Sequence, residues 1–460
     1  MTVPASVNTL VLKNSIARYR ALIERALCSV QPAADNSLHP FDPGYLLPAQ
    51  SAAFDRFTSV SSVGVTDLGT YRGRTLRLLD LMRNPRTRTT KTLASLVIVA
   101  RAVRYIHDTG EPVMIITPSS ANKATALRDA VYRAIEFGLV KSSQLKITTV
   151  VPAGSSSKLW SSPLSEDSEL RVRNPMVLHG SSEPADVKVL AQEFADSYSA
   201  ALRDRYRVNL WYTLSLDNYR PADTVRAYFE HEFLPRPGPM GRLHVHAVSS
   251  AFGLLGHNLG HRICDDNKPG PRYFLVQHLG TPDMVLSLHF GEADRRHMPR
   301  YTYDATAGLH RQEADPRFPA STLSLNEVLD STFYTRRPPT SAKMNEIIHS
   351  GGGGGIVVSL HECLMRYGQE RALLANTDID LPSDPRGLRE WSLVMALTGT
   401  LNAIDRDLID PDEEIVVHGS GCYSENDFQP LPAEHTSSAA GCSQLAELVS
   451  GAVERDLAAC

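Results

Sequence analysis

Apolar and polar positions follow two different patterns along this chain, and the two patterns take turns from Tyr71 onward. Short runs rich in β-branched residues are typical of buried strands, whereas apolar residues spaced three and four apart are typical of helices. The runs predict strands at Val113–Ile116, Leu145–Val151, Met176–His179, Asn209–Leu214, Leu243–Val248, Tyr273–Gln277, Ile356–Ser359 and Glu414–His418. The spaced residues predict helices at Leu93–Ile106, Ala124–Phe137, Ala185–Leu202, Asp223–Phe233, Gly253–His261, Leu360–Gly368 and Leu388–Leu408. This alternation predicts an α/β protein with largely parallel sheets.

Two regions depart from the alternation. The first sixty residues contain one predicted helix, Ser15–Cys28, followed by a connection rich in Pro, Ser and Ala. Such composition is typical of irregular structure, so we expect an extension laid on the main body. Ala314–Ser341 is rich in proline and predicts a long surface excursion.

The composition narrows the class of protein. A chain of 460 residues suits two domains, and 42% hydrophobic and 21% charged residues are typical of soluble globular proteins. The net charge of -4 gives no reason to expect nucleic acid or an anionic membrane as a partner. The sequence shows no secretory signal and no apolar stretch near the roughly 20 residues that span a bilayer. The six cysteines form no C-x-x-C pair, which indicates reduced thiols, and we expect a cytoplasmic protein.

Three junctions between a strand or turn and a helix carry groups suited to chemistry. Parallel sheets place ligands at the carboxyl ends of strands, where loops lead into helix N-termini. The first junction is a hydroxyl-rich turn from Arg83 to Lys91, the second is Thr117–Asn122, and the third is Ser249–Gly253. The third offers two hydroxyls, backbone N–H groups and a helix dipole to a phosphate.

The order and spacing of these motifs resemble the fold type II family of pyridoxal-phosphate enzymes, and threonine synthase most of all. Asn84-Pro85 leads to Lys91, and Ser119-Ser120-Ala121-Asn122 ends 31 residues later, like the family's Asn-Pro turn, Schiff-base lysine and Ser-Ser-Gly-Asn loop. Further motifs are similar in the same order: Trp211–Arg220, Leu243–Gly260 with its phosphate loop, Phe274–Gln277, and Leu408–Glu413 before Val416–Gly421. The resemblance covers about Arg72–Asp427.

The resemblance implies a cofactor, a set of site residues and a reaction class. Pyridoxal 5′-phosphate would bind Lys91, which would then move the Cα proton of an amino-acid substrate. The residues that would contact the cofactor are Lys91, Asn122, Ser249, Ser250, Ala251, Phe252, Gly253 and Ser420, with Asn122 at the phenolic oxygen, 249–253 at the phosphate and Ser420 at the pyridine nitrogen. Thr90, Ser119 and Ser120 would contact the substrate. A neutral hydroxyl at the ring nitrogen suits elimination and replacement better than transamination.

The same resemblance implies two domains with the cofactor between them. The large domain would comprise 54–103 and 209–430, and the small domain 104–208. An N-terminal extension (1–53) and a C-terminal tail (431–460) would flank them. We expect a homodimer that catalyses β- or γ-elimination or replacement on an α-amino acid bearing a leaving group.

Several positions differ from the family pattern and leave other functions open. Ala251 and Phe252 stand in a loop that is normally glycine-rich, Ala121 replaces a glycine, and Thr92 follows the lysine. A serine or threonine dehydratase or racemase, or a non-catalytic scaffold that binds the cofactor, would also fit. A dinucleotide-binding protein is disfavoured because no G-x-G-x-x-G follows an early strand.

Three other signals are assigned structural roles. Gly351–Gly355 lacks the Gly-Lys-Ser/Thr of a P-loop and predicts a flexible turn. His244, His246, His257, His261 and Cys264 suggest zinc, but Asn258 replaces the glutamate of a metalloprotease motif, so we expect core or pocket histidines and no metal. Lys123 is the rival Schiff-base lysine, and we expect its side chain to point away from the site.

Overall fold

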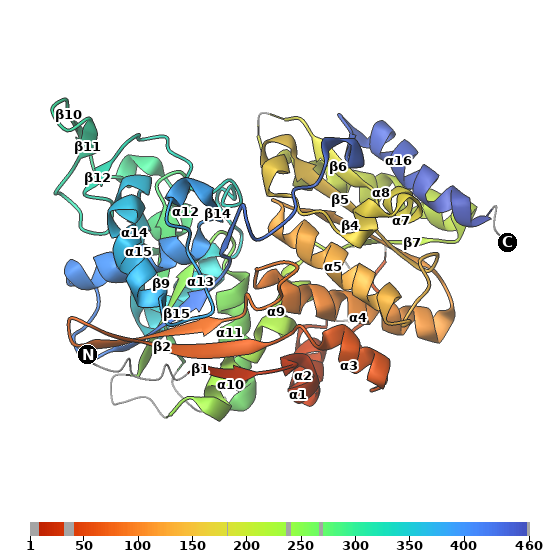
Figure 1. Ribbon diagram of the computed structural model, residues 1–460, viewed down its shortest axis with the longest axis horizontal. Coiled ribbons are helices and arrows are strands. Elements are labelled where there is room, and N and C mark those ends of the chain that lie inside the picture. The colour runs from red at the N-terminus through yellow and green to blue at the C-terminus, as the bar shows by residue number, and fades with distance from the viewer. Residues whose placement is uncertain (1–8, 32–40, 182, 236–240, 266–269, 458–460) are drawn as a thin grey trace. The chain divides into compact units, whose positions relative to one another are not determined.

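The computed structural model describes residues 9–31, 41–181, 183–235, 241–265 and 270–457 (Figure 1). The chain folds into two compact units, each assembled from several segments. Unit 1 comprises Met1–Leu12, Ser62–Arg83 and Arg226–Asp427. Unit 2 comprises Lys13–Ser61, Asn84–Val225 and Phe428–Cys460.

Unit 1 is built on a seven-stranded sheet in the order β1-β2-β3-β15-β8-β9-β13. The five strands from β3 to β13 run parallel, and β2 pairs antiparallel with β1 and β3 at one side. Its elements are β1 (Thr9–Leu12), β2 (Val63–Tyr71), β3 (Arg74–Asp80), α10 (Val225–Phe233), β8 (Arg242–Ala247), α11 (Phe252–Cys264), β9 (Arg272–His278), α12 (Asp283–Phe290), β10 (Thr302–Asp304), β11 (Leu309–Arg311), β12 (Ser321–Thr322), α13 (Ser341–Gly351), β13 (Gly353–Val358), α14 (Leu360–Leu374), β14 (Leu388–Glu390), α15 (Ser392–Asp405), β15 (Glu414–Gly419) and β16 (Tyr423–Ser424).

The two faces of this sheet differ in chemistry. Successive strand residues point to opposite faces, so β8 places Leu243 and Val245 on one face and His244 and His246 on the other. The first face packs on α14 and α15 in one apolar core that also contains Phe274, Val276, Ile356, Val358, Ile415 and Val417. The second face carries the histidines, and α10 and α11 supply the residues that meet them.

Unit 2 is built on a five-stranded sheet in the order β17-β6-β5-β4-β7, in which every pair is parallel. Helix α8 packs on β4, β5 and β7, and the C-terminal helix α16 packs on α8. The elements are α1 (Ser15–Arg18), α2 (Arg20–Val30), α3 (Ala52–Thr58), α4 (Lys91–Thr109), β4 (Val113–Pro118), α5 (Asn122–Glu136), β5 (Leu145–Pro152), α6 (Pro163–Glu166), α7 (Ser168–Arg173), β6 (Met176–His179), α8 (Asp186–Tyr206), β7 (Asn209–Tyr212), α9 (Leu216–Asp223), β17 (Ser437–Ser438) and α16 (Cys442–Leu457). The α/β class and the largely parallel sheets predicted from the sequence are thus confirmed.

The units do not coincide with the domain boundaries expected from the sequence. Helix α4 and strand β7 were expected in the large domain but belong to unit 2, because β7 pairs with β4 and α4 packs on α5. The expected C-terminal tail also belongs to unit 2, where β17 pairs with β6. The pairing partners are distant in sequence, so composition and local spacing did not show them.

Much of the expected N-terminal extension is also integrated into unit 2. Arg101 on α4 is fully buried, and its guanidinium donates to Asp42 at 2.7 Å and to the Asn218 side chain at 2.6 Å. The same guanidinium lies over the rings of Tyr45 and Trp211. A buried cation that is paired and stacked in this way holds residues 42–45 against α4 and α9.

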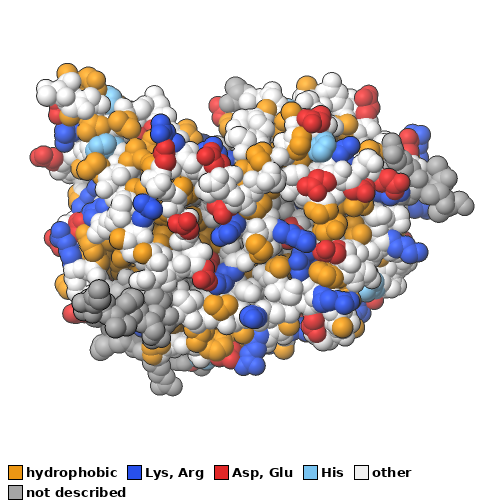
Figure 2. Space-filling view, viewed as in Figure 1, with side chains coloured by type: hydrophobic (Ala, Val, Ile, Leu, Met, Phe, Trp, Pro, Cys, Tyr) orange, Lys and Arg blue, Asp and Glu red, His pale blue; other side chains and the backbone are white. Residues whose placement is uncertain are grey.

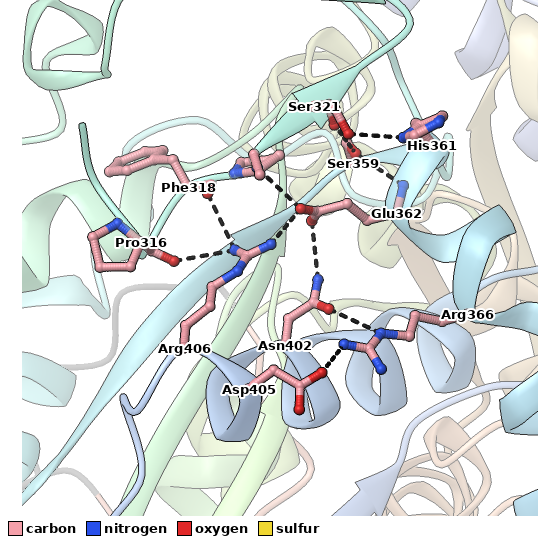
Figure 3. A network of polar contacts seen from close by, with 12 residues as sticks. Pro316, Phe318, Ser321, Ser359, His361, Glu362, Arg366, Asn402, Asp405 and Arg406 are labelled. Carbon is pink, nitrogen blue, oxygen red and sulfur yellow. Dashed lines mark hydrogen bonds and ion pairs between the residues drawn. The ribbon is translucent and has the colours of Figure 1, made fainter. Parts of the chain in front are cut away.

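Polar contacts hold the proline-rich excursion (Ala314–Ser341) to α14 and α15 (Figure 3). The Glu362 carboxylate accepts from the backbone N–H of Ala320 at 3.0 Å and from the Asn402 amide at 3.1 Å, and it pairs with Arg406. Arg406 in turn donates to the carbonyl of Phe318 at 3.1 Å, and the Phe318 ring is fully buried. This part of the excursion is therefore anchored, whereas the sequence predicted a surface segment.

The pentaglycine is mostly a strand. Gly351 ends α13, and the last three glycines open β13 beside β9. Gly353 has φ +125°, and a Cβ there would lie 1.8 Å from the carbonyl oxygen of Tyr273. The prediction of a flexible turn is wrong for Gly353–Gly355, because the glycines allow two backbones to approach closely.

The surface charge, the helix lengths and the cysteines relate to the sequence-based expectations about nucleic acid, membranes and disulfides. Figure 2 shows Lys and Arg side chains interspersed with Asp and Glu over the face that it displays. Among the described helices, none is long and apolar enough to cross a bilayer. The five described cysteines have free thiols, and Cys460 lies outside the described residues.

Candidate active site

The turn before Lys91 is closed by Asn84 and tied to α5. The Asn84 carbonyl accepts from the N–H groups of Thr87 at 3.1 Å and Arg88 at 2.9 Å. Its side-chain amide donates to the Asp129 carboxylate on α5 at 2.8 Å. Lys91, half-buried, is the first residue of α4. The Asn-Pro turn therefore fixes where the N-terminus of α4 presents its lysine.

The loop between β4 and α5 is organised by Ser119. Its hydroxyl oxygen accepts from the backbone N–H of Ala121 at 3.1 Å and of Ala124 at 2.8 Å. The residue is buried, so this oxygen serves the loop, and its hydroxyl hydrogen remains the group that it can offer to a ligand. Ser120 and Asn122 are half-buried, and Asn122 is the first residue of α5.

Ala121 occupies a backbone conformation that favours glycine. Its φ is +121° and its ψ is -60°, outside the regions open to residues with a Cβ at low cost. Strain of this kind costs on the order of 1–3 kcal/mol. It is found in folded proteins only where contacts with the surrounding residues hold the backbone in that conformation. Ala121 is fully buried, and the Ser119 hydroxyl oxygen accepts from its backbone N–H, so these contacts hold Ala121 in a conformation that glycine would adopt at lower cost.

Replacing Ala121 with glycine is expected to raise the stability of the protein. Relief of the strain, less the greater entropy of glycine in the unfolded chain, should give a gain of about 0.5–2 kcal/mol. Ala126→Gly, within the regular part of α5, should instead cost about 1 kcal/mol or more. Urea unfolding of both variants checks this, and a loss of stability in Ala121→Gly would contradict the strain.

Lys123, the rival Schiff-base lysine, is the second residue of α5. Its ammonium lies 5.8 Å from the centre of the Tyr219 ring, on α9. Burial lowers the pKa of Lys123 well below its usual range, and the charges of Lys188 and Lys91 lower it further. Since Lys91 contributes to this shift, the two amines at the N-termini of α4 and α5 lie within electrostatic range of each other.

In unit 1, the predicted phosphate loop connects β8 to the N-terminus of α11. Ser249 and Ser250 are half-buried, and the Ser250 carbonyl accepts from Thr340 at 2.9 Å. Ala251 adopts a left-handed conformation with φ +55° and caps α11, which begins at Phe252. The N-terminus of a helix presents backbone N–H groups and a positive dipole end, so this loop has the form of an anion site.

A buried arginine behind this loop was missed by the sequence analysis. Arg226 on α10 is 3% exposed, and its Nη2 lies 3.1 Å from where a Cβ on Gly253 would be. Gly253 thus lets the helix backbone approach a guanidinium, which adds positive charge to the anion site. No motif marks Arg226, because its direction depends on how α10 packs against α11.

Ser420 and Thr90 belong to different units. Ser420 is half-buried and directly follows β15, which pairs with β8 in parallel, so Ser420 and the Ser249–Gly253 loop share the carboxyl edge of the unit 1 sheet. Thr90 is buried and forms the N-cap of α4 in unit 2. The structure therefore gathers the predicted residues into two groups: Thr90, Lys91, Ser119, Ser120 and Asn122 in unit 2, and Ser249–Gly253 with Ser420 in unit 1.

Each group fits one part of pyridoxal phosphate. The helix N-terminus and the guanidinium beside Gly253 suit a phosphate dianion. A lysine at the start of α4 and an asparagine at the start of α5 suit an aldehyde and a neighbouring phenolic oxygen. The donor sets therefore match the cofactor that the sequence resemblance implies.

Comparison with solved structures defines the class of fold. The chain is similar to threonine synthase from Brucella melitensis, at 13% identity with a TM-score of 0.51, over 95% of this chain and 91% of that one. It is also similar to threonine synthase from yeast, at 13% identity with a TM-score of 0.51, over 89% of this chain and 83% of that one. The fold is that of the fold type II pyridoxal-phosphate enzymes, as the sequence motifs predicted.

Comparison with family models gives the particular family. Residues 11–453 match the family of unknown function DUF6002, and the chain belongs to that family. No curated protein matches the sequence.

Proposed function

We propose that this protein is a pyridoxal 5′-phosphate-dependent enzyme that acts on an α-amino acid. The observation that carries the proposal is the arrangement in unit 2, where the Asn84 turn delivers Lys91 to one helix N-terminus and the Ser119–Asn122 loop delivers Asn122 to the next. The fold supports it, since the solved structure from Brucella melitensis is described as threonine synthase with this cofactor bound.

The roles proposed for unit 2 follow from the groups that it presents. Lys91 would bind the cofactor covalently and then hold and move the substrate Cα proton at its Nζ atom. Asn122 would donate a hydrogen bond to the phenolic oxygen. Ser120, the hydroxyl hydrogen of Ser119 and Thr90 would orient the substrate carboxylate.

In unit 1, the loop Ser249–Gly253 and Arg226 would hold the phosphate, and Ser420 would contact the pyridine nitrogen. The bound cofactor would supply an electron sink for carbanion chemistry at Cα. A neutral hydroxyl cannot hold a proton on the ring nitrogen as a carboxylate would, which suits elimination and replacement. The proposed reaction is therefore β- or γ-elimination or replacement on an amino acid bearing a leaving group.

A second candidate is a non-catalytic scaffold that binds the cofactor. The left-handed Ala251 favours it, because a Cβ in this loop limits how closely the backbone approaches a phosphate. A dehydratase or racemase acting on serine or threonine would use the same proposed site residues and differ in the reaction that follows removal of the Cα proton. We expect a small-molecule amino-acid substrate, a homodimer and a cytoplasmic location.

Two measurements on the purified protein separate these candidates. Added pyridoxal phosphate should produce the visible absorption of the lysine-bound cofactor. A panel of amino acids, including O-phospho- and O-acetyl-serine and -homoserine, should then contain one whose Cα proton exchanges with deuterium by NMR. Cofactor binding with no exchange across the panel would favour the scaffold, and absence of binding would contradict the proposal as a whole.

A further inference from the structure

Glu230 and five of the chain's 16 histidines lie together on the polar face of the unit 1 sheet. We call this the histidine cluster: Glu230 on α10, His244 and His246 on β8, His257 and His261 on α11, and His418 on β15. The two β8 histidines share a face, and His246 pairs in register with His418. His257 and His261 are four residues apart on one side of α11. Cys264, which the sequence grouped with them, is not among the gathered residues that the structure describes.

Four members of the histidine cluster bring their ligand atoms to one point. Glu230 Oε2 lies 2.9 Å from His257 Nε2 and 3.0 Å from His261 Nε2, and Glu230 Oε1 lies 3.5 Å from His244 Nε2. All four ligand atoms can lie within 4.8 Å of one another. A tetrahedral zinc ion with bonds of about 2.0–2.1 Å separates its ligand atoms by about 3.3 Å. The two Oε2 distances are slightly shorter than this value and the other separations lie within 4.8 Å, so binding would require the side chains to move until the four ligand atoms surround one cation.

The residues around these four hold them as metal ligands are usually held. Arg242 donates to Glu230 Oε1 at 2.9 Å, which leaves Oε2 toward the imidazoles, and Arg242 also pairs with Glu414 at 3.0 Å. His257 Nδ1 lies 2.8 Å from the buried Tyr273 hydroxyl. A ligating histidine commonly uses its second ring nitrogen in this way to fix its orientation.

Two further observations favour a ligand over a purely hydrogen-bonded core. His246 is 5% exposed, and its Nε2 atom has no hydrogen-bond partner among the described residues. Its ligand atom lies within 4.8 Å of those of His257 and His418. A buried polar atom without a partner is costly, and a nearby ion is one explanation for it.

We propose that Glu230, His244, His257 and His261 bind one divalent transition-metal ion of the zinc type. Carboxylate and imidazole ligands in a set of four suit zinc, and four protein ligands leave no open position for substrate. The site would be structural: it would fasten α10 and α11 to β8 and so fix the helix whose N-terminus forms the phosphate loop. His261, whose side chain is 30% exposed, gives the ion a path from solvent.

Metal binding has one identifiable cost in the neighbouring contacts. Binding through Nε2 moves the His244 proton to Nδ1, which would donate to His418 Nε2, 3.0 Å away. His418 would then carry its proton on Nδ1, which faces Arg226 Nη1 at 3.2 Å, and two donors repel. The Arg226 contact would therefore be lost when the ion binds.

The test is titration of the full-length, untagged, chelator-treated protein with ZnCl2 in a calorimeter. One ion per chain should bind with a dissociation constant of about 0.1 µM or tighter, as structural sites do. Co²⁺ in its place should give the intense visible d–d bands of tetrahedral coordination. No one-to-one binding, or the weak bands of octahedral cobalt, would overturn the proposal.

Variants locate the ion. His261 is partly exposed, so His261→Ala should fold, and circular dichroism checks this; it should weaken zinc binding by about 100-fold or more and change the cobalt spectrum. His349→Ala is the control, because His349 is an exposed histidine on α13, outside the histidine cluster, that contacts the Leu288 carbonyl at 3.1 Å. Its zinc binding should equal that of the wild type. Unchanged binding in His261→Ala, or an equal loss in both variants, would refute the assignment.

Discussion

Replacing Lys91 with alanine is expected to abolish the chemistry of this protein. The proposed role of Lys91 is both to bind pyridoxal phosphate covalently and to move the substrate Cα proton. Its loss should reduce deuterium exchange at Cα by about 10³-fold or more, since a positioned general base alone contributes 10²–10⁴-fold. Borohydride reduction of the wild type, followed by peptide mapping, should attach the cofactor to Lys91.

Two other lysines make this experiment specific. Lys123 is the rival, because its amine is enclosed and lies within electrostatic range of Lys91. Lys123→Met should keep the rate of deuterium exchange within about tenfold of the wild type. Lys123 would influence the site only through its charge, which contributes less to the rate than Lys91 does as the base. Lys343, exposed and paired with Glu346 at 2.8 Å, is the control in which nothing should change. A label on Lys123, or loss of exchange in Lys123→Met alone, would move the centre of the site to α5.

The stability of unit 1 should fall as the pH rises through neutrality, because of Glu370. This residue on α14 is fully buried, and its Oε1 accepts from the Thr398 hydroxyl of α15 at 2.6 Å. Its Oε2 has no hydrogen-bond partner in the described residues. Burial raises the pKa of Glu370 from 4.5 to about 8. The carboxyl group is therefore protonated over most of the physiological range in the folded protein.

The direction of the effect follows from proton binding. Between the unfolded pKa of 4.5 and the folded value of about 8, the folded state binds a proton that the unfolded state does not. The contribution of Glu370 to the free energy of unfolding is therefore fully present below pH 4.5. It is lost as the pH rises toward the folded pKa, at about 1.4 kcal/mol per pH unit. Glu370→Gln mimics the protonated form, so its stability relative to the wild type should increase by roughly 3 kcal/mol between about pH 5 and pH 8.

The comparison across pH removes effects that do not titrate. In Glu370→Gln, the amide group next to the position of Oε2 lowers the free energy of unfolding by the same amount at every pH. It therefore shifts the values measured at the two pH values equally. Glu346→Gln, at the exposed partner of Lys343, is the control and should show no such change with pH. Thermal unfolding of both variants at the two pH values measures this, and a parallel pH dependence of Glu370→Gln and the wild type would show that Glu370 is ionised when buried.

The elements that the sequence predicted correctly are those whose pattern is local. β4 and β5 are buried along their whole length, so their runs of apolar and β-branched residues marked them within a residue or two. β2 and β3 were missed because they form an antiparallel hairpin with no helix between them, and polar residues such as Thr66 and Arg77 interrupt their apolar runs. Strand pairing between distant segments decided which unit each element joins, and no local pattern contains that information.

The same distinction holds for the sites. Lys91, Ser119 and Ser249 belong to short motifs in which a turn, a helix start and a polar group are neighbours in sequence. Arg226 and Glu230 stand on α10 with no motif around them, and their roles follow from the packing of α10 against α11 and β8. The histidine pairs were visible as an alternating pair on a strand and an i, i+4 pair on a helix. Their convergence required the register of β8 with β15.

The last helix of unit 2 affects the order in which the protein can fold during synthesis. Leu445 and Val449 of α16 are fully buried against α8, in a core with Phe194 and Leu202. That face of α8 is made about 250 residues earlier and would remain exposed on the ribosome until α16 emerges, since chains lengthen by about 5–20 residues per second. All of unit 1, by contrast, has been made once Asp427 emerges. The unit that carries Lys91 therefore completes its core last, and until then its α8 face is a surface to which chaperones can bind.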